Sequence, residues 1–131
     1  MKFDFEKLEN IFSNQIEVKA AYLFGSYARG EQKTDSDIDI GILLDENFDR
    51  IIKLDLLTSL TENGFDDVDL VILNNASILL KYEIVKNNNL IYSRSDFDTS
   101  SYFSKIIRLY LDFKPYLEVQ REYLKERILN G

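Results

Sequence analysis

The residues of this chain that are best suited to chemistry lie between Gly25 and Asp39. Gly25 and Ser26 are followed by ten residues and then by two acids, Asp37 and Asp39. A glycine turn lets a ligand approach the backbone closely, and backbone N–H groups at the start of a helical turn, together with a serine hydroxyl, can bind phosphate. Two carboxylates at alternate positions of a strand point to one face, where their repulsion favours a divalent cation between them. The segment therefore predicts a phosphate-binding turn beside a metal site.

Two further residues extend this candidate site. Arg29 follows the glycine–serine turn by one helical turn and can contact a phosphate or clamp the loop. Asp69 begins a second apolar strand, just as Asp37 and Asp39 begin theirs, so three carboxylates meet at one end of the sheet if the two strands are neighbours. Metal ions held in this way can orient a nucleoside triphosphate and activate an attacking hydroxyl. Asp69 would then be a metal ligand, a general base or both, and Asp67, on the same predicted strand face, is the alternative third carboxylate.

Each feature taken alone has an ordinary structural explanation. An Asp-X-Asp pair is commonly the solvated face of a strand, a glycine–serine pair can be a plain strand-to-helix turn, and Arg29 can be a surface arginine. The combination and its spacing favour the functional interpretation.

The composition narrows the possible chemistry. The chain has no cysteine and no histidine, which excludes disulfides, thiol nucleophiles, Ser-His-Asp hydrolysis and tetrahedral zinc sites. A metal must be held by oxygen ligands, which suits Mg²⁺, Mn²⁺ or Ca²⁺, and a general base must be a carboxylate, lysine or tyrosine. The net charge of −7 disfavours direct binding of a nucleic acid. The sequence has neither a signal peptide nor an apolar run long enough to span a membrane, so we expect a cytoplasmic protein.

The elements that must position the site residues follow from hydrophobic periodicity. The pattern predicts strands over 18–24, 37–44 and 68–73, a short edge strand over 90–93, and helices over 3–14, about 48–63, 76–87 and about 99–130. These elements indicate an α+β fold in one domain over residues 1–131, a small mixed β-sheet backed by helices on one side. Pro115 either kinks the C-terminal helix or starts a second helix there, which would make a kinked helical pair.

Periodicity also predicts which side chains face the core. In the strand over 37–44, Ile38, Ile40, Ile42 and Leu44 share one face, and Asp37, Asp39, Gly41 and Leu43 share the other. In the helix over about 48–63, Asn47 or Asp49 is the expected N-cap, Gly64 is the expected C′ residue, and the inward residues are Ile51, Ile52, Leu56 and Leu60.

The C-terminal segment is rich in aromatic residues. Tyr102, Tyr110, Phe113, Tyr116 and Tyr123 can form a docking face for a partner or can pack into the core. We favour core packing for Phe103, Ile106, Ile107 and Tyr110, and beyond Pro115 both interpretations stay open.

Two motifs of this chain and one later acid resemble the polymerase-β-type nucleotidyltransferase superfamily. The motifs are Phe24-Gly25-Ser26-Tyr27-Ala28-Arg29-Gly30 and Ser36-Asp37-Ile38-Asp39-Ile40, and the later acid is Asp69. Within it, they resemble the minimal nucleotidyltransferases of the MntA antitoxin type. The resemblance is clear over about residues 18–73 and looser towards the C-terminus.

This resemblance implies a fold, an activity and a partner. Its members have a small mixed sheet backed by helices, bind ATP with Mg²⁺ and transfer AMP to a hydroxyl; MntA antitoxins modify a tyrosine of a HEPN ribonuclease toxin of the HepT type. By this likeness Gly25 and Ser26 hold the triphosphate, Asp37 and Asp39 bind the metal, and Asp69 completes the metal site and can accept a proton. Arg29 matches the arginine of the family as a nucleotide-binding residue.

Two other functions stay open at this point. The chain can be a non-catalytic antitoxin that neutralises a toxin by contact alone. It can also be a small-molecule nucleotidyltransferase of the aminoglycoside type, although 131 residues leave little room for the extra helical domain that such enzymes usually carry. A polymerase is disfavoured by the negative charge and by the lack of a separate DNA-gripping segment.

Overall fold

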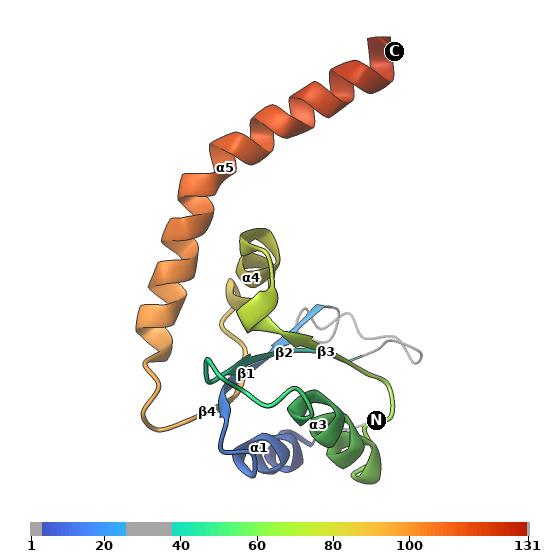
Figure 1. Ribbon diagram of the computed structural model, residues 1–131, viewed down its shortest axis with the longest axis vertical. Helices are drawn as coiled ribbons and strands as arrows, with labels where there is room; N and C mark the ends of the chain where they lie inside the picture. Colours follow the sequence, from blue (N-terminus) through green and yellow to red (C-terminus); the bar gives the residue numbers. More distant parts are fainter. Residues whose placement is uncertain (1–3, 26–37, 131) are drawn as a thin grey trace.

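The computed structural model of this chain describes residues 4–25 and 38–130, with side chains described up to residue 127. Figure 1 shows a sheet with helices on both faces and a long C-terminal helix that leaves the body of the molecule. The elements, in chain order, are α1 (Phe5–Ser13), β1 (Val18–Phe24), β2 (Ile38–Leu44), α3 (Ile52–Glu62), β3 (Val68–Ile72), the 3₁₀ turn η1 (Leu73–Asn75), α4 (Ile78–Val85), β4 (Leu90–Ser93) and α5 (Thr99–Asn130).

The four described strands form one mixed sheet in the order β3-β2-β1-β4. β1 pairs antiparallel with β2 and with β4, whereas β2 and β3 are parallel. The parallel pair follows from the helical crossover through α3, since parallel neighbours need a long connection. The α+β fold with a small mixed sheet is therefore confirmed, as is the position of β4 at an edge.

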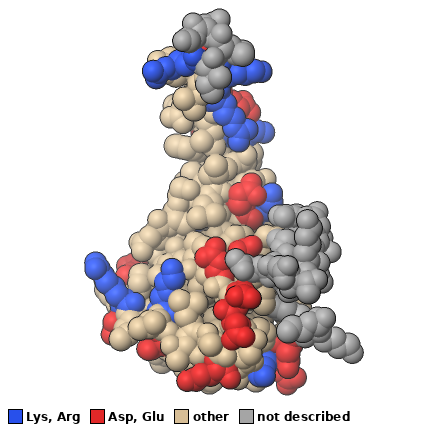
Figure 2. Space-filling model, turned by 90° about the vertical axis from the view of Figure 1, so that its right-hand side faces the viewer, with Lys and Arg blue, Asp and Glu red and all other residues tan. Residues whose placement is uncertain are grey.

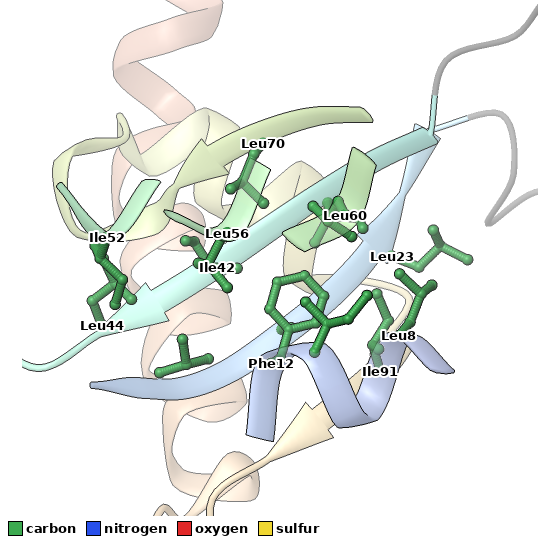
Figure 3. Packing of buried hydrophobic residues seen from close by; sticks show 14 residues of the cluster. Leu8, Phe12, Leu23, Ile42, Leu44, Ile52, Leu56, Leu60, Leu70 and Ile91 are labelled. Carbon is green, nitrogen blue, oxygen red and sulfur yellow. The ribbon is translucent and has the colours of Figure 1, made fainter. Parts of the chain in front are cut away.

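The helices cover both faces of the sheet, so the expectation that they lie on one side was wrong. α1 and α3 pack on one face, where Figure 3 shows Phe12 and Leu56 against Ile42 of β2. α4 and the first half of α5 cover the opposite face, where Tyr22 and Ile106 are buried. Because each face is covered by helices, β1 is apolar along nearly its whole length rather than strictly alternating.

α3 begins later than its sequence pattern predicts. Its N-cap is Ile51, which has helical backbone angles and no capping side chain. Asp49 instead accepts a hydrogen bond from the Ile51 N–H in the turn before the helix, and Ile51 is exposed rather than inward-facing. The other residues of α3 that were predicted to face the core, Ile52, Leu56 and Leu60, are buried. Gly64 follows the C-cap with φ +90°, as a C′ glycine does.

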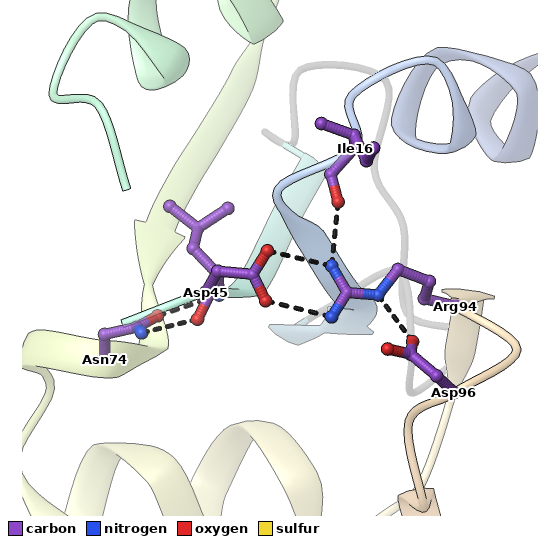
Figure 4. A network of polar contacts seen from close by, with 6 residues as sticks. Ile16, Asp45, Asn74, Arg94 and Asp96 are labelled. Atoms are coloured by element: carbon purple, nitrogen blue, oxygen red, sulfur yellow. Dashed lines mark hydrogen bonds and ion pairs between the residues drawn. The ribbon is translucent and has the colours of Figure 1, made fainter. Parts of the chain in front are cut away.

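A polar cluster fixes the end of the sheet at which β2 terminates (Figure 4). Arg94 donates two hydrogen bonds to the carboxylate of Asp45, at 2.9 and 3.0 Å, one to the carbonyl of Ile16 and one to Asp96. The side chain of Asn74 pairs with both backbone groups of Leu44, as another strand would. These contacts tie the ends of β2, β4 and η1 together, at the end of the sheet opposite the one where β2 begins.

α5 is one continuous helix with Pro115 inside it. Figure 1 shows the helix bending along its length, as a proline that removes a backbone hydrogen bond would cause. The alternative of a second, separate helix is thus not realised. None of the described helices, α5 included, combines the length and the apolar character that a membrane crossing requires.

Candidate active site

Two of the predicted acids occupy matched positions at the start of neighbouring strands. Asp39 of β2 and Asp69 of β3 are register partners in the parallel pairing. Register partners on adjacent strands lie about 4.8 Å apart and point to the same face of the sheet. Asp39 is half-buried and Asp69 is exposed. The strand pairing therefore brings the two carboxylates together on one face, at the end where β2 and β3 begin.

Gly25 lies directly beside Asp39. The residue before it, Phe24, is the register partner of Asp39 across the antiparallel pairing of β1 and β2. A Cβ atom placed on Gly25 would overlap the Asp39 carboxylate, reaching 3.0 Å from its Cγ, and Gly25 has φ +73°. Both the backbone conformation and the close approach of a side chain require glycine here, so Gly25 lies directly against the carboxylate of Asp39.

The face that carries Asp39 is the face covered by α4. Gly41, two residues further along β2, would place a Cβ only 2.7 Å from Cγ2 of Ile84, which is a residue of α4. A glycine inside a strand commonly marks such a close approach. The absence of a side chain at Gly41 lets the last turn of α4 rest on the sheet immediately beside the acids, where it borders the site.

The loop after α4 returns to the same region. The backbone N–H of Leu23 donates to the carbonyl of Asn89 at 2.8 Å, and Asn88 holds a left-handed conformation with φ +51°. This loop therefore lies against the last residues of β1, two residues before Gly25.

Ser26, Arg29 and Asp37 lie outside the residues that the structure describes. The helical turn predicted for Ser26–Arg29, and the place of these three residues in the site, stay predictions. Within the described residues, no group of three or more acidic side chains is gathered closely enough to hold a metal ion. The described part of the predicted triad is the pair Asp39 and Asp69, and Asp67 directly precedes β3, two residues before Asp69.

Gly41 is the residue of this region that sequence reasoning did not single out. The pattern placed it on the same face as Asp39, and a lone glycine in an otherwise apolar strand is itself a signal of close packing. The helix that packs on it, α4, was predicted, but the side of the sheet that it covers was not.

A family model described as polymerase beta, nucleotidyltransferase matches residues 6–97. The protein adenylyltransferase MntA of Shewanella oneidensis is 30% identical to this chain over 116 residues, which is 88% of this chain and 80% of that protein.

Solved structures resemble the chain over almost its whole length. A crystal structure of a toxin–antitoxin with AMP-PNP contains a chain with a TM-score of 0.75 and 28% identity, covering 97% of this chain and 99% of that chain. A structure of a tri-AMPylated Shewanella oneidensis HEPN toxin in complex with an MNT antitoxin has a matching chain with a TM-score of 0.66 and 26% identity, covering 95% of each.

Proposed function

Because the chain belongs to the polymerase-β nucleotidyltransferase family, we propose that it is a protein adenylyltransferase. It transfers AMP from ATP to a hydroxyl group of a partner protein, a toxin of the HepT-like HEPN type, and acts as the antitoxin of that toxin. The single observation that carries this proposal is the register pairing of Asp39 with Asp69 beside Gly25. This pairing supports a site for nucleotidyl transfer at the end of the sheet where β2 and β3 begin.

The choice of acceptor rests on the relatives. MntA of Shewanella oneidensis is a protein adenylyltransferase, and the matching structures include a HEPN toxin that is tri-AMPylated. A similarity that extends over 88% of this chain includes part of α5 as well as the sheet, and it supports a protein acceptor over a small molecule.

The residues present fit a divalent metal ion with oxygen ligands. Asp39 and Asp69 share one face at neighbouring positions, and the chain has no histidine or cysteine that would favour a softer metal. Asp37, Asp39 and Asp69 would hold Mg²⁺ there. When bound, Mg²⁺ supplies charge neutralisation for the triphosphate and for the oxygens that develop charge in the transition state.

The residues of the chain then have distinct tasks in the transfer. Gly25 and Ser26 bind the phosphates through backbone N–H groups and the serine hydroxyl, and Arg29 contacts the same nucleotide. The oxygen of the acceptor hydroxyl forms a bond to the α-phosphorus of ATP, while the bond from that phosphorus to the bridging oxygen breaks and pyrophosphate leaves. Asp69 accepts the proton of the hydroxyl, because it is the exposed member of the pair and is open to an incoming partner.

The position of the label in ATP tests this proposal. The purified chain is incubated with Mg²⁺, the partner toxin and ATP that is labelled at either the α- or the γ-phosphate. We expect the α-label on the partner, no γ-label, and no transfer when Mg²⁺ is chelated. Transfer of the γ-label would identify a kinase instead, and suppression of the toxin without any label would identify a non-catalytic binding protein.

A further inference from the structure

The two halves of α5 have different surroundings. In the first half, Ile106 is buried and the ring of Tyr110 stacks on Tyr82 of α4, with centroids 3.7 Å apart. From residue 111 onwards the described side chains are exposed, with Leu117 alone half-buried. Phe113, Tyr116, Tyr123 and Leu124 are between 44% and 68% exposed. Figure 1 shows this second half projecting away from the sheet and from α4.

The apolar face of the projecting half continues the face that packs on α4. The residues on this face are spaced alternately by four and three positions, which is a heptad spacing. Starting from Ile106 and Tyr110, this spacing continues through Phe113, Leu117, Gln120 and Leu124. Tyr116 and Tyr123 lie next to this line on the helix surface. We refer to Phe113, Tyr116, Leu117, Gln120, Tyr123 and Leu124 as the tail stripe. Spacing of this kind is the pattern with which one helix packs along another.

Beyond the end of the α4 contact the tail stripe has no cover among the described residues. Exposed apolar side chains gathered in this way mark a protein interaction site. The apolar face that packs on α4 thus continues past the body of the molecule, where none of the described residues supplies a second helix to cover it.

The charge of the projecting half also differs from that of the body. Residues 111–131 contain four acidic and four basic side chains, so the whole net charge of −7 lies in residues 1–110. Figure 2 shows blue side chains gathered near the free end of the helix and several red ones over the body. A partner docked on the tail is therefore not repelled there by the acidic charge of the body.

A second copy of this chain is a poor occupant for the tail stripe. Two tails that met only along this stripe would bury on the order of 500 Å² per copy, less than the roughly 800 Å² per partner of a stable interface. A partner that contacts both the tail and the active-site edge makes a larger interface. Figure 1 shows the projecting half leaning towards the side of the molecule on which β1 ends.

We propose that the tail stripe is the docking surface for a helix of the partner toxin, and that it delivers the acceptor hydroxyl to the active site. The identity of the partner rests on the proposed function. The matching chain of the toxin–antitoxin structure with AMP-PNP covers 97% of this chain, so that relative also has most of the projecting half.

A pair of double variants in the full-length chain tests the proposal. Phe113→Ser with Leu124→Ser alters the tail stripe, and Leu111→Ser with Glu118→Gln alters residues on the opposite side of the same helix half, where no residue three or four positions away belongs to the stripe. All four side chains are exposed, so neither variant loses core packing, which circular dichroism and thermal unfolding check. The dissociation constant for the purified toxin and the steady-state kinetics of AMP transfer are measured for both.

We expect the stripe variant to raise the dissociation constant and the KM for the toxin roughly tenfold or more, as the loss of central interface anchors does. Its kcat at saturating toxin and its affinity for ATP with Mg²⁺ remain those of the wild type. The control variant stays within about twofold of the wild type in every quantity. A stripe variant that binds toxin as tightly as the wild type overturns the proposal.

Analytical ultracentrifugation of the chain alone tests whether a second copy of the chain, rather than the toxin, occupies the tail stripe. If the wild type is a dimer, the stripe variant is a monomer and toxin binding is unchanged, the stripe is a self-association surface and the proposal is wrong. If the wild type binds toxin but transfers no AMP, the proposed function fails, whereas the docking proposal is still decided by the dissociation constants of the two variants.

Discussion

Asp39 and Asp69 are register partners on the two parallel strands of the sheet, so their side chains leave the same face at the same level. Neither residue contributes to the apolar core. Two neighbouring carboxylates repel each other unless a cation binds them, and this supports the functional role that we propose for Asp39 and Asp69.

Asp69→Asn is expected to lower kcat for AMP transfer by about 100-fold or more, the range associated with loss of a general base, while the free energy of unfolding stays close to that of the wild type. Asp67→Asn is the matched control, because Asp67 is also exposed and lies two residues earlier. Steady-state kinetics at saturating Mg²⁺ give both values. If Asp67→Asn is the damaging change and Asp69→Asn is mild, the third carboxylate has been assigned to the wrong residue.

Gly25→Ala is expected to abolish most of the transfer activity, because the new methyl group would displace the Asp39 carboxylate. Gly64→Ala isolates the backbone effect: Gly64 also has a positive φ, but nothing lies within 4 Å of the position that a Cβ would take there. Both variants should lose about 1 kcal/mol of unfolding free energy from backbone strain. Urea unfolding and transfer assays separate the two effects, and equal activity in both variants would argue against the carboxylate displacement.

Gly41→Ala is expected to destabilise the fold by about 1–3 kcal/mol through the collision with Ile84. In an Ile84→Ala background the colliding methyl groups are gone, so the same glycine substitution should cost clearly less. A double-mutant cycle on unfolding free energies measures this coupling. Strictly additive costs would show that α4 does not rest on β2 in the way described.

Asp45→Asn is expected to reduce the free energy of unfolding at neutral pH by about 1 kcal/mol, because Asp45 is partly exposed and its ion pair is screened. The hydrogen bonds from Arg94 keep the pKa of Asp45 below its ordinary value of 3.8. A lowered carboxyl pKa stabilises the fold above the ordinary value, and this contribution disappears as the pH falls through the lowered one. The difference between wild type and variant should therefore shrink in acid below pH 3.8.

Glu46→Gln, a change at the exposed neighbour of Asp45, serves as the control in the same denaturation series. If the loss of unfolding free energy caused by Asp45→Asn is the same at neutral pH and in acid, the ion pair with Arg94 is not the source of that loss.

The elements with clear local signals were predicted closely. β1 runs from Val18 to Phe24 as expected, because a β-branched and aromatic run stops at a glycine. α3 was expected to begin too early, with Asn47 or Asp49 as its N-cap, whereas its N-cap is Ile51 and Asp49 caps only the preceding turn. Local signals mark where a helix can begin, and the packing of Ile52 and Leu56 on the sheet decides where it does.

The arrangement of the elements was predicted less well. Helices were expected on one side of the sheet, yet the apolar length of β1 is what burial on both faces produces. The apolar spacing along α5 is the same before and after Pro115, so only the structure distinguishes the packed Tyr110 from the exposed Tyr123. The pairing of Asp39 with Asp69 likewise depended on β2 and β3 being neighbours, which the sequence could suggest but not establish.

The intact mass of the partner toxin tests the central claim most directly. The toxin is incubated with ATP, Mg²⁺ and either the wild-type chain or its Asp39→Asn variant, and is then weighed by mass spectrometry. We predict that the wild type adds the mass of one or more adenylyl groups and that the variant, which should remain folded and bind the toxin, adds none. A toxin that keeps its original mass with the wild type, or that is modified equally well by Asp39→Asn, would contradict the account.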